Sequence, residues 1–391
     1  MGRQAGPDAA GAADARAKAK VLFVGFFPPP VNGQRIVTQR MFEQLDAVAT
    51  VACCDIDRFR HLGPFSKLVS AIAGCGALIN ARSRGYATLY LAPHSGAGLI
   101  YSWLIALTGR CCGYDMVVHY HSYRNMGRHT RLMAGFLALC GPNALHIVLA
   151  PPMARDLRRF YGSARHVAVL SNTTFIPPRE VERAFSGQRL RVGHLSNLSR
   201  EKGIGSVLDC LRELWARGVE VELWLAGPAE DAQTGRMIAE AQATFGDRIN
   251  YLGRLSAGDV RRFYDDIDIF LFPTAYEHEA EPLVIVDAIS AGVPVIATDR
   301  GCISYLLGVT GGRVLAAEDF VAQSVEQIAA WAQDPGQLAA VAAHAQARFA
   351  ELHEHSRLQL DRLLATIVNG VSNDTDVKSA DFQSPASPRP Q

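Results

Sequence analysis

One stretch of 25 residues, Thr274 to Thr298, constrains the fold of this chain most strongly: TAYEHEAEPLVIVDAISAGVPVIAT. It follows a short apolar run, Ile269–Phe272, which is closed by Pro273. The apolar residues between Leu283 and Ala291 recur with helical rather than alternating spacing. The stretch therefore predicts a strand, an acidic loop, a helix and a second strand, which is the repeating unit of a parallel α/β sheet.

Two residues orient this helix. Pro282 stands where the first helical residue is expected, because its missing N–H costs nothing there, and Gly292 falls just past the last periodic residue. The free N–H groups and the positive dipole end of the helix would then face a crevice at the carboxyl end of a strand. Such a crevice is a favourable place for a phosphate group.

Carboxylates surround the start of the helix. Glu277, Glu279 and Glu281 stand just before it, and Asp287 stands one turn inside it. Ionised carboxylates only accept hydrogen bonds, so beside a phosphate they suit the neutral hydroxyls of a ribose or a hexose. The alternative is that these acids merely favour a helix N-terminus, and composition alone leaves both interpretations open.

Glu279 and Asp287 are separated by seven residues, with Pro282-Leu283 between them and the run AGVPVIA after them. This arrangement resembles the E-x7-E signature of family 4 retaining glycosyltransferases, which have the GT-B architecture of two Rossmann-like domains. The resemblance implies that Glu279 binds the donor sugar and that Asp287, one methylene shorter than the usual Glu, binds the ribose. It assigns the donor diphosphate to the residues between the two acids. These are Ala280, Glu281, Pro282 and Leu283.

Length and composition limit the class of protein. A chain of 391 residues with 49% hydrophobic and 20% charged residues suits two globular domains. The net charge of +1 argues against a general nucleic-acid binder. The eight cysteines show no metal-ligand spacing and suit a reducing compartment, so we expect a cytoplasmic protein. The N-terminus has no apolar core for a secretory signal, and no uninterrupted apolar run reaches a membrane span; Leu89–Thr108 comes closest.

Strand–helix alternation occurs twice along the chain, so the predicted fold is α/β, with two facing Rossmann-like domains and the active site in the interdomain cleft. The domains are expected at 20–175, the acceptor domain, and at 189–350, the nucleotide-sugar donor domain, with a linker at 176–188. A C-terminal helix is expected at 351–371. The lead-in at 1–19 and the tail at 372–391 are expected to be disordered.

Two segments of the first domain are candidates for the site. After the strand Lys20–Gly25, a proline turn leads to Gly33 and Gln34, where backbone can approach a diphosphate, although a plain strand-to-helix turn explains it too. The same loop resembles the phosphate-contacting first loop of the family. His119 and His121 alternate at the tip of the predicted strand Met116–Ser122. That tip resembles the family's H-x-H-(G/S) segment, which implies a role for His121 at the donor sugar or the acceptor.

In the second domain, Lys202 before a glycine resembles the family's phosphate-contacting lysine, and Arg200 is the second cation of that turn. The arginine usual five positions before the lysine is Asn197 here, so Arg200 is expected to substitute for it. A charged solvated turn is the alternative. Two D-x-D sequences imitate a metal site, but we interpret 55–57 as a strand ending and 266–268 as a turn into a strand. No metal site or cofactor is expected.

The resemblance implies transfer of a sugar from a nucleotide diphosphate sugar to an acceptor hydroxyl, with retention and without metal, in polysaccharide or glycolipid synthesis. Two alternatives stay open: a sugar-nucleotide epimerase of the same architecture, and a non-catalytic nucleotide-sugar-binding module.

The segment from Met116 to Val167 carries seven arginines and one acid, Asp156. Arg155, Arg158 and Arg159 are spaced i, i+3 and i+4 on a predicted helix, hence on one side of it. The alternative is an ordinary solvated face. The hypothesis is a peripheral enzyme that uses these arginines to bind the anionic inner face of a membrane and acts on a lipid-linked acceptor.

Overall fold

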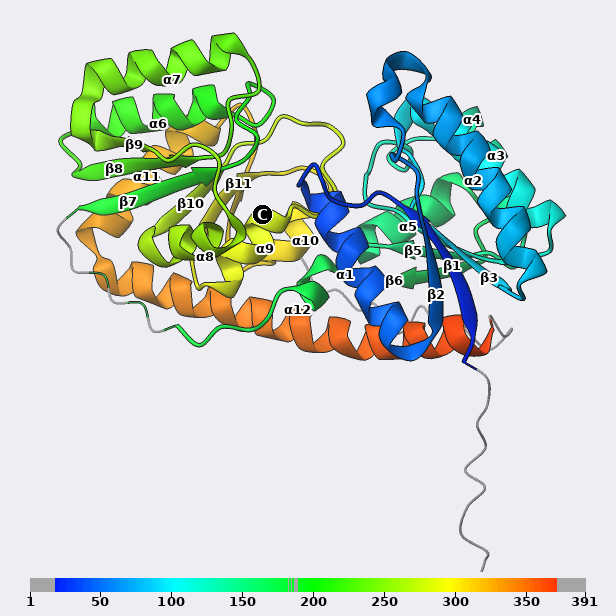
Figure 1. Ribbon diagram of the computed structural model, residues 1–391. Helices are drawn as coiled ribbons and strands as arrows, with labels where there is room; N and C mark the ends of the chain where they lie inside the picture. The colour runs from blue at the N-terminus through cyan, green and yellow to red at the C-terminus, as the bar shows by residue number, and fades with distance from the viewer. Residues whose placement is uncertain (1–17, 182, 184, 186–188, 371–391) are drawn as a thin grey trace, which may run out of the picture.

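Two parallel sheets of six strands each form the frame of the protein (Figure 1). The computed structural model describes residues 18–181, 183, 185 and 189–370. The expected disordered tail, nearly all of the expected lead-in and part of the linker lie outside these residues.

The first sheet has the strand order β2-β1-β3-β4-β5-β6, with every neighbouring pair parallel. Its central strands are nearly continuous buried apolar runs, as expected for a sheet covered on both faces. The strands are β1 (Lys20–Gly25), β2 (Thr50–Asp55), β3 (Thr88–Leu91), β4 (Asp115–His119), β5 (Leu145–Val148) and β6 (His166–Val169).

Helices cover both faces of this sheet. On one face Leu78, Ile105 and Leu157 belong to one buried cluster, and on the other Met41 packs with residues from the end of the chain. The helices are α1 (Gly33–Val48), α2 (Ser66–Ser83), α3 (Leu99–Cys111), α4 (Arg131–Cys140) and α5 (Pro151–Phe160), with 3-10 turns η1 (Arg60–Phe65), η2 (Gly96–Gly98) and η3 (Asn172–Phe175).

The second sheet has the order β12-β11-β10-β7-β8-β9, again all parallel. The predicted α/β fold of two Rossmann-like domains is therefore confirmed. Its strands are β7 (Leu190–Leu195), β8 (Val221–Ala226), β9 (Ile249–Tyr251), β10 (Ile269–Phe272), β11 (Val295–Thr298) and β12 (Gly312–Leu315). Its helices are α6 (Ile204–Ala216), α7 (Ala232–Phe245), α8 (Ala257–Asp266), α9 (Leu283–Ser290), α10 (Ile303–Leu307) and α11 (Phe320–Gln333), with a 3-10 turn η4 (Gly246–Arg248).

The C-terminal helix α12 (Pro335–Asn369) joins the two domains (Figure 1). The C-terminal helix expected at 351–371 begins earlier, at Pro335, because the chain leaves helical geometry only at Asp334, whose carboxylate then caps α12. Leu338 is buried in a core cluster of the second domain, whereas Leu360 is buried in a cluster of the first. One continuous helix thus contributes to both cores.

One helical stretch in the described part of the chain, Arg60–Ser83, is long and apolar enough to cross a membrane by length and composition alone. This corrects the expectation that no run would qualify and that Leu89–Thr108 would come closest. The stretch consists of η1 and α2, with a break at Gly63 followed by Pro64.

Candidate functional site

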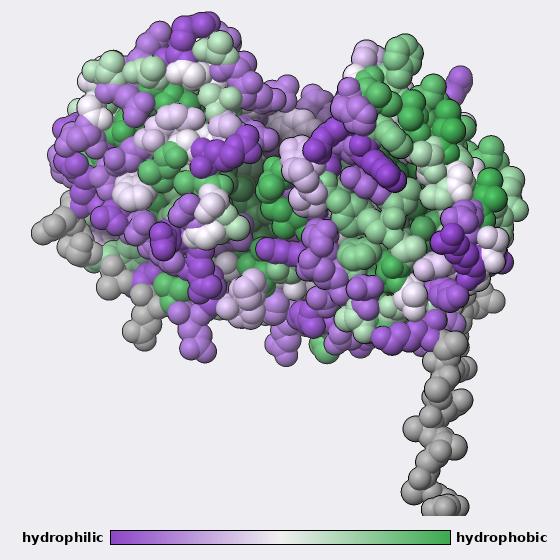
Figure 2. Space-filling model, in the orientation of Figure 1, coloured by the Kyte–Doolittle hydropathy of each residue, from purple (hydrophilic) through white to green (hydrophobic). Residues whose placement is uncertain are grey.

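The carboxyl ends of the strands in both sheets face a hollow between the domains (Figure 2). Loops from the two sides meet there. The backbone N–H of Tyr123, in the loop after β4, donates to the carbonyl of His278, in the loop after β10, at 3.3 Å. Carboxyl ends of parallel strands are where α/β sheets bind ligands, so the hollow is the candidate site.

Lys202 and Glu279 meet in this hollow. Lys202 lies in the turn after β7 and Glu279 in the loop after β10, and Lys202 Nζ donates to Glu279 Oε2 at 2.5 Å. Their side chains are 23% and 12% exposed. Nζ also lies 4.6 Å from the ring centre of Tyr276. Two residues 77 positions apart therefore form a charged pair that is partly shielded from water and within reach of a ligand.

Gly203 allows the turn that carries Lys202 to lie against β10. Its φ is 86°, and a Cβ at this position would lie 2.1 Å from the carbonyl oxygen of Pro273. No side chain fits at that distance, so glycine is required here.

The loop before α9 is held by the first domain. The Glu281 carboxylate accepts from Ser171 Oγ at 2.7 Å and from the backbone N–H of Asn172 at 2.5 Å. Burial raises the pKa of Glu281 to about 7, against the lowering effect of these hydrogen bonds. The side chain of Glu281 thus joins the domains, and a donor contact from this residue would come from its backbone. Ala280 is also buried, and its carbonyl accepts from the N–H of Cys302 at 2.9 Å.

Helix α9 begins one residue later than expected. Pro282 has φ −69° and ψ 122°, so it is the N-cap and Leu283 is the first helical residue. Gly292 follows the end of the helix with φ 65°, as expected for a residue just past the last turn.

Asp287 lies half-buried one turn inside α9. Burial raises its pKa to about 6, and the charges of Arg40 and Arg179 oppose this rise. Arg40 comes from α1 of the first domain and donates to the carbonyl of Phe175 at 2.6 Å. Sequence analysis did not select either arginine, because no spacing rule links them to Asp287.

Helix α1 begins at Gly33, inside the stretch that was expected to be the turn before the helix. The Asn32 side chain accepts from the N–H of Arg35 at 3.0 Å and caps the helix. Gly33 and Gln34 therefore lie in the first turn, where backbone N–H groups have no partner inside the helix. A Cβ on Gly33 would lie 3.5 Å from Leu283 Cδ1, so the N-termini of α1 and α9 approach each other across the cleft.

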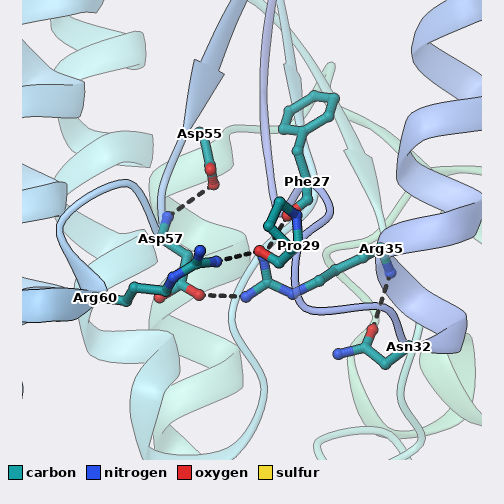
Figure 3. Close-up of polar contacts among 7 residues, drawn as sticks. All are labelled: Phe27, Pro29, Asn32, Arg35, Asp55, Asp57 and Arg60. Atoms are coloured by element: carbon teal, nitrogen blue, oxygen red, sulfur yellow. Dashed lines mark hydrogen bonds and ion pairs between the residues drawn. The ribbon is translucent and has the colours of Figure 1, made fainter. Parts of the chain in front are cut away.

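Two arginine side chains hold the loop before α1 in place (Figure 3). Arg35 donates to the carbonyl of Phe27 at 2.5 Å and forms an ion pair with Asp57, and Arg60 donates to the carbonyl of Pro29. Asp55 ends β2, and its carboxylate accepts from the N–H of Asp57 at 2.9 Å. The first D-x-D sequence thus lies at a strand end, as interpreted, and supports the loop.

The second D-x-D sequence spans the end of α8 at Asp266, and Asp268 accepts from the N–H of Arg191 at 2.8 Å. Among the residues that the structure describes, no group of three or more His, Cys, Asp or Glu side chains is placed to hold a metal ion.

The two histidines at the end of β4 differ in position. His119 is the last residue of the strand, whereas His121 lies in the following loop, so the predicted strand to Ser122 is too long. Their ring centres are 4.2 Å apart. Burial lowers the pKa of His121 to about 4, so its ring is neutral near pH 7. Nε2 of His121 is buried without a hydrogen-bond partner among the described residues.

His121 borders a small cavity of about 20 Å³ that Gln34 and His94 also line. Nδ1 of His94 lies 3.1 Å from Ser102 Oγ, and burial lowers the pKa of His94 to about 4. Sequence analysis passed over His94, although its place after β3 is the same kind of signal as that of His121 after β4. A wider cavity of about 680 Å³, open to solvent, is lined by Arg124 and Arg128 of the first domain and by Glu277 of the second.

Asn197 and Arg200 are exposed in the turn that leads to Lys202. Hydrogen bonds with Thr234 lower the pKa of Asp231, and the charge of Arg200 adds to this effect. Arg200 is therefore near the start of α7, and the structure does not bring it into the Lys202–Glu279 pair.

The three arginines of α5 lie along the outer side of that helix. Arg155 and Arg159 are exposed and Arg158 is half-buried, in a helix that runs close to its predicted bounds. The neighbouring acid, Asp156, accepts from the hydroxyl of Tyr123 at 2.6 Å.

The two sheets, the cleft and the shared C-terminal helix define the two-domain α/β fold called GT-B. The solved structure of HepE from Anabaena, in complex with UDP and glucose, has a TM-score of 0.66 to this chain. The match covers 89% of this chain and 100% of HepE at 16% sequence identity, which is a likeness of fold alone.

Residues 189–334, in the second domain, match a family model described as Glycosyl transferases group 1. The chain is 28% identical over 125 residues to the amylovoran biosynthesis glycosyltransferase AmsK of Erwinia amylovora, covering 31% of this chain and 30% of AmsK. It is 36% identical over 113 residues to the lipopolysaccharide core biosynthesis mannosyltransferase LpsB of Rhizobium meliloti, covering 28% and 30%. The chain thus matches less than a third of the length of either relative.

Proposed function

We propose that this protein is a family 4 retaining glycosyltransferase that moves a sugar from a nucleotide diphosphate sugar to an acceptor hydroxyl in polysaccharide or glycolipid synthesis. The observation that carries the proposal is the Lys202–Glu279 pair, which lies in a cleft where the N-termini of α1 and α9 approach each other. A cation and two helix N-termini suit a diphosphate, and a carboxylate beside them suits sugar hydroxyls. The sequence similarity to the glycosyltransferases AmsK and LpsB supports sugar transfer, and the likeness to HepE supports the fold in which it occurs.

The donor diphosphate binds between the first turns of α1 and α9, at Gly33 and Gln34 on one side and 280–283 on the other. The Lys202 ammonium turns from Glu279 to the diphosphate, and Arg200 is a second cation at the edge of the site. Glu279, released from Lys202, accepts hydrogen bonds from the donor sugar. Asp287 accepts from the ribose hydroxyls. In this arrangement the positive charge of Lys202 lies beside the diphosphate, where negative charge develops as the leaving group departs.

The reaction breaks the bond between the anomeric carbon and the diphosphate oxygen and forms a new bond from that carbon to the acceptor oxygen on the same face. A phosphate oxygen of the departing nucleotide diphosphate takes the proton of the acceptor hydroxyl. His121, neutral near pH 7 and with a buried Nε2 that has no hydrogen-bond partner among the described residues, hydrogen-bonds a hydroxyl of the donor sugar or of the acceptor. No metal ion takes part in these steps.

The acceptor is lipid-linked, and the enzyme works on the inner face of an anionic membrane. Arg155, Arg158 and Arg159 contribute to this attraction from the outer side of α5. The names of AmsK and LpsB, which belong to the synthesis of amylovoran and of lipopolysaccharide core, support a surface-polysaccharide acceptor.

A donor screen tests the proposal. The protein is incubated with labelled nucleotide sugars, one at a time, in the presence and absence of a bacterial lipid extract. The expected result is label in the extract with release of nucleotide diphosphate. Isomerised donor that forms without acceptor would indicate an epimerase instead, and binding without turnover would indicate a non-catalytic module.

A further inference from the structure

The outer side of α2 and α3 exposes apolar side chains that contribute little to the core. Eight of the thirteen exposed large hydrophobic residues in the described part of the chain lie between positions 62 and 107. We call six of them the α2–α3 apolar face: Leu68, Ile72, Ile79, Ile100, Leu104 and Leu107. Figure 2 shows hydrophobic residues gathered over these helices. Clusters of this kind on a protein surface mark interaction sites.

The face is continuous because the two helices are in contact. On α3 the three residues are spaced i, i+4 and i+7, and on α2 they are spaced i, i+4 and i+11, so each set lies in one stripe along its helix. The Thr108 hydroxyl, on α3, lies 3.2 Å from the sulfur of Cys75, on α2. The opposite sides of these helices hold Leu78 and Ile105, which are fully buried against the sheet. Ile72, by contrast, is 60% exposed, so its side chain has no role in the core.

The segment of the chain that carries the face is basic. The sequence from Arg58 to Tyr114 contains no acid and six basic residues. Lys67 and Arg84 are exposed at the two ends of α2. An apolar stripe with a basic rim complements a bilayer that contains anionic lipids, because the apolar side chains enter the headgroup region and the cations meet the phosphates. A second copy of this chain is a poorer occupant, since a symmetric contact would bring two basic rims together.

The start of α2 lies close to the cleft. Arg60, in η1, donates to the carbonyl of Pro29 in the loop before α1. Burial is the main cause of the lowered pKa of His94, which lines the cavity beside His121; the charge of Lys67 adds to this lowering and that of Asp57 opposes it. The break at Gly63 and the packing of α2 on the sheet favour a helix that lies in the membrane surface over one that crosses it.

We propose that the α2–α3 apolar face docks on an anionic lipid bilayer and brings the cavity beside His121 to the membrane surface. The supply of a lipid-linked acceptor to that cavity rests on the proposed function, whereas the docking does not.

Co-sedimentation of the full chain with vesicles tests the docking. Vesicles of phosphatidylcholine with phosphatidylglycerol are compared with vesicles of phosphatidylcholine alone. The double variant Ile72→Asp/Leu104→Asp should bind the anionic vesicles at least ~10-fold more weakly than the wild type, because it places charge in the headgroup region. Lys67→Gln/Arg84→Gln should weaken binding and reduce its dependence on salt.

The control is Val309→Asp/Leu358→Asp, which makes the same change at apolar residues 72% and 55% exposed outside the face, and it should bind like the wild type. Thermal unfolding of each variant shows that the fold is retained. Arg155→Gln/Arg158→Gln/Arg159→Gln measures the separate contribution of α5.

Equal vesicle binding by the wild type and Ile72→Asp/Leu104→Asp would overturn the proposal. A second result would also overturn it: the wild type does not bind vesicles but forms a dimer in solution, and Ile72→Asp/Leu104→Asp abolishes that dimer. A protein that docks through this face but transfers no sugar would overturn the proposed function and leave the docking supported.

Discussion

Lys202 Nζ donates a hydrogen bond to Glu279 Oε2 at 2.5 Å. This pairing explains how one cleft can receive both a diphosphate and a sugar. A donor that attracts Lys202 leaves Glu279 with lone pairs for sugar hydroxyls, so binding of the two parts of the donor is coupled. The aromatic ring of Tyr276 lies under the Lys202 ammonium and holds it in the cleft.

Replacing Glu279 by Ala should lower the transfer rate at least ~10²-fold, as the loss of one well-placed polar group does in other enzymes. The fold should survive, because the side chain lies at the edge of the cleft. Glu326→Ala, which removes an exposed carboxylate from α11, is the matched control and should leave the rate unchanged. Steady-state kinetics with the donor found in the screen give the comparison, and wild-type turnover in Glu279→Ala would remove this residue from the site.

Replacing Asp287 should change the free energy of unfolding and the affinity for the donor in opposite directions. Its pKa of about 6 in the folded protein exceeds the ordinary value of 3.8, so folding favours the protonated form. The resulting cost to stability is absent below about pH 4, grows as the pH rises to about 6, and stays constant above that. Asp287→Asn should therefore raise stability at pH 8, by up to about 3 kcal/mol, and should give no gain at pH 4.

The same variant should bind the donor more weakly, because a neutral amide accepts fewer hydrogen bonds from ribose hydroxyls. Denaturant unfolding at the two pH values and a binding titration with the donor measure both effects. A variant that is less stable at pH 8, or that binds the donor as well as the wild type, would contradict the role of Asp287.

At the scale of single elements, the turn between β7 and α6 depends on one glycine. Gly203→Ala should destabilise the protein by roughly 1–3 kcal/mol, because it combines a positive φ with a contact that no Cβ can make. Gly205→Ala, two residues on in α6, has open space around its Cβ and should be neutral or slightly stabilising. Melting temperatures of the two variants test this, and equal effects would show that the turn is not constrained as described.

Elements with a strong local signal were predicted well from sequence. The bounds of β1 and β10 agree with the structure because short apolar runs between turn residues leave little choice. Helices α4, α7 and α10 were not predicted, and in α4 a glycine inside a ten-residue apolar run conceals the helical period. The start of α1 was placed late because Asn32 was interpreted as part of a turn, whereas it caps the helix.

The site was predicted less completely than the elements. Spacing along the chain identified Lys202 and Glu279 separately, but only the folded structure pairs them. The contact of Glu281 with Ser171 joins residues 110 positions apart, and the approach of Arg40 to Asp287 depends on how the domains are placed. No local rule contains such information, because it arises from packing between domains.

The whole molecule is two sheets joined by α12 and by the Glu281 contacts, with the cleft between them. Its positive charge at the proposed diphosphate site comes from Lys202 and helix N-termini, so the reaction should proceed without a divalent cation. Transfer measured with and without EDTA should be equal. Loss of activity that added manganese restores would show that one of the D-x-D sequences binds metal after all.

The stereochemistry of the product tests the central claim most directly. Proton NMR of the reaction, followed in time with the donor identified in the screen and its acceptor, reports the configuration at the anomeric carbon and the release of nucleotide diphosphate together. The account predicts a product with the donor's anomeric configuration that forms in step with nucleotide diphosphate. An inverted product, or consumption of donor without transfer to the acceptor, would contradict it.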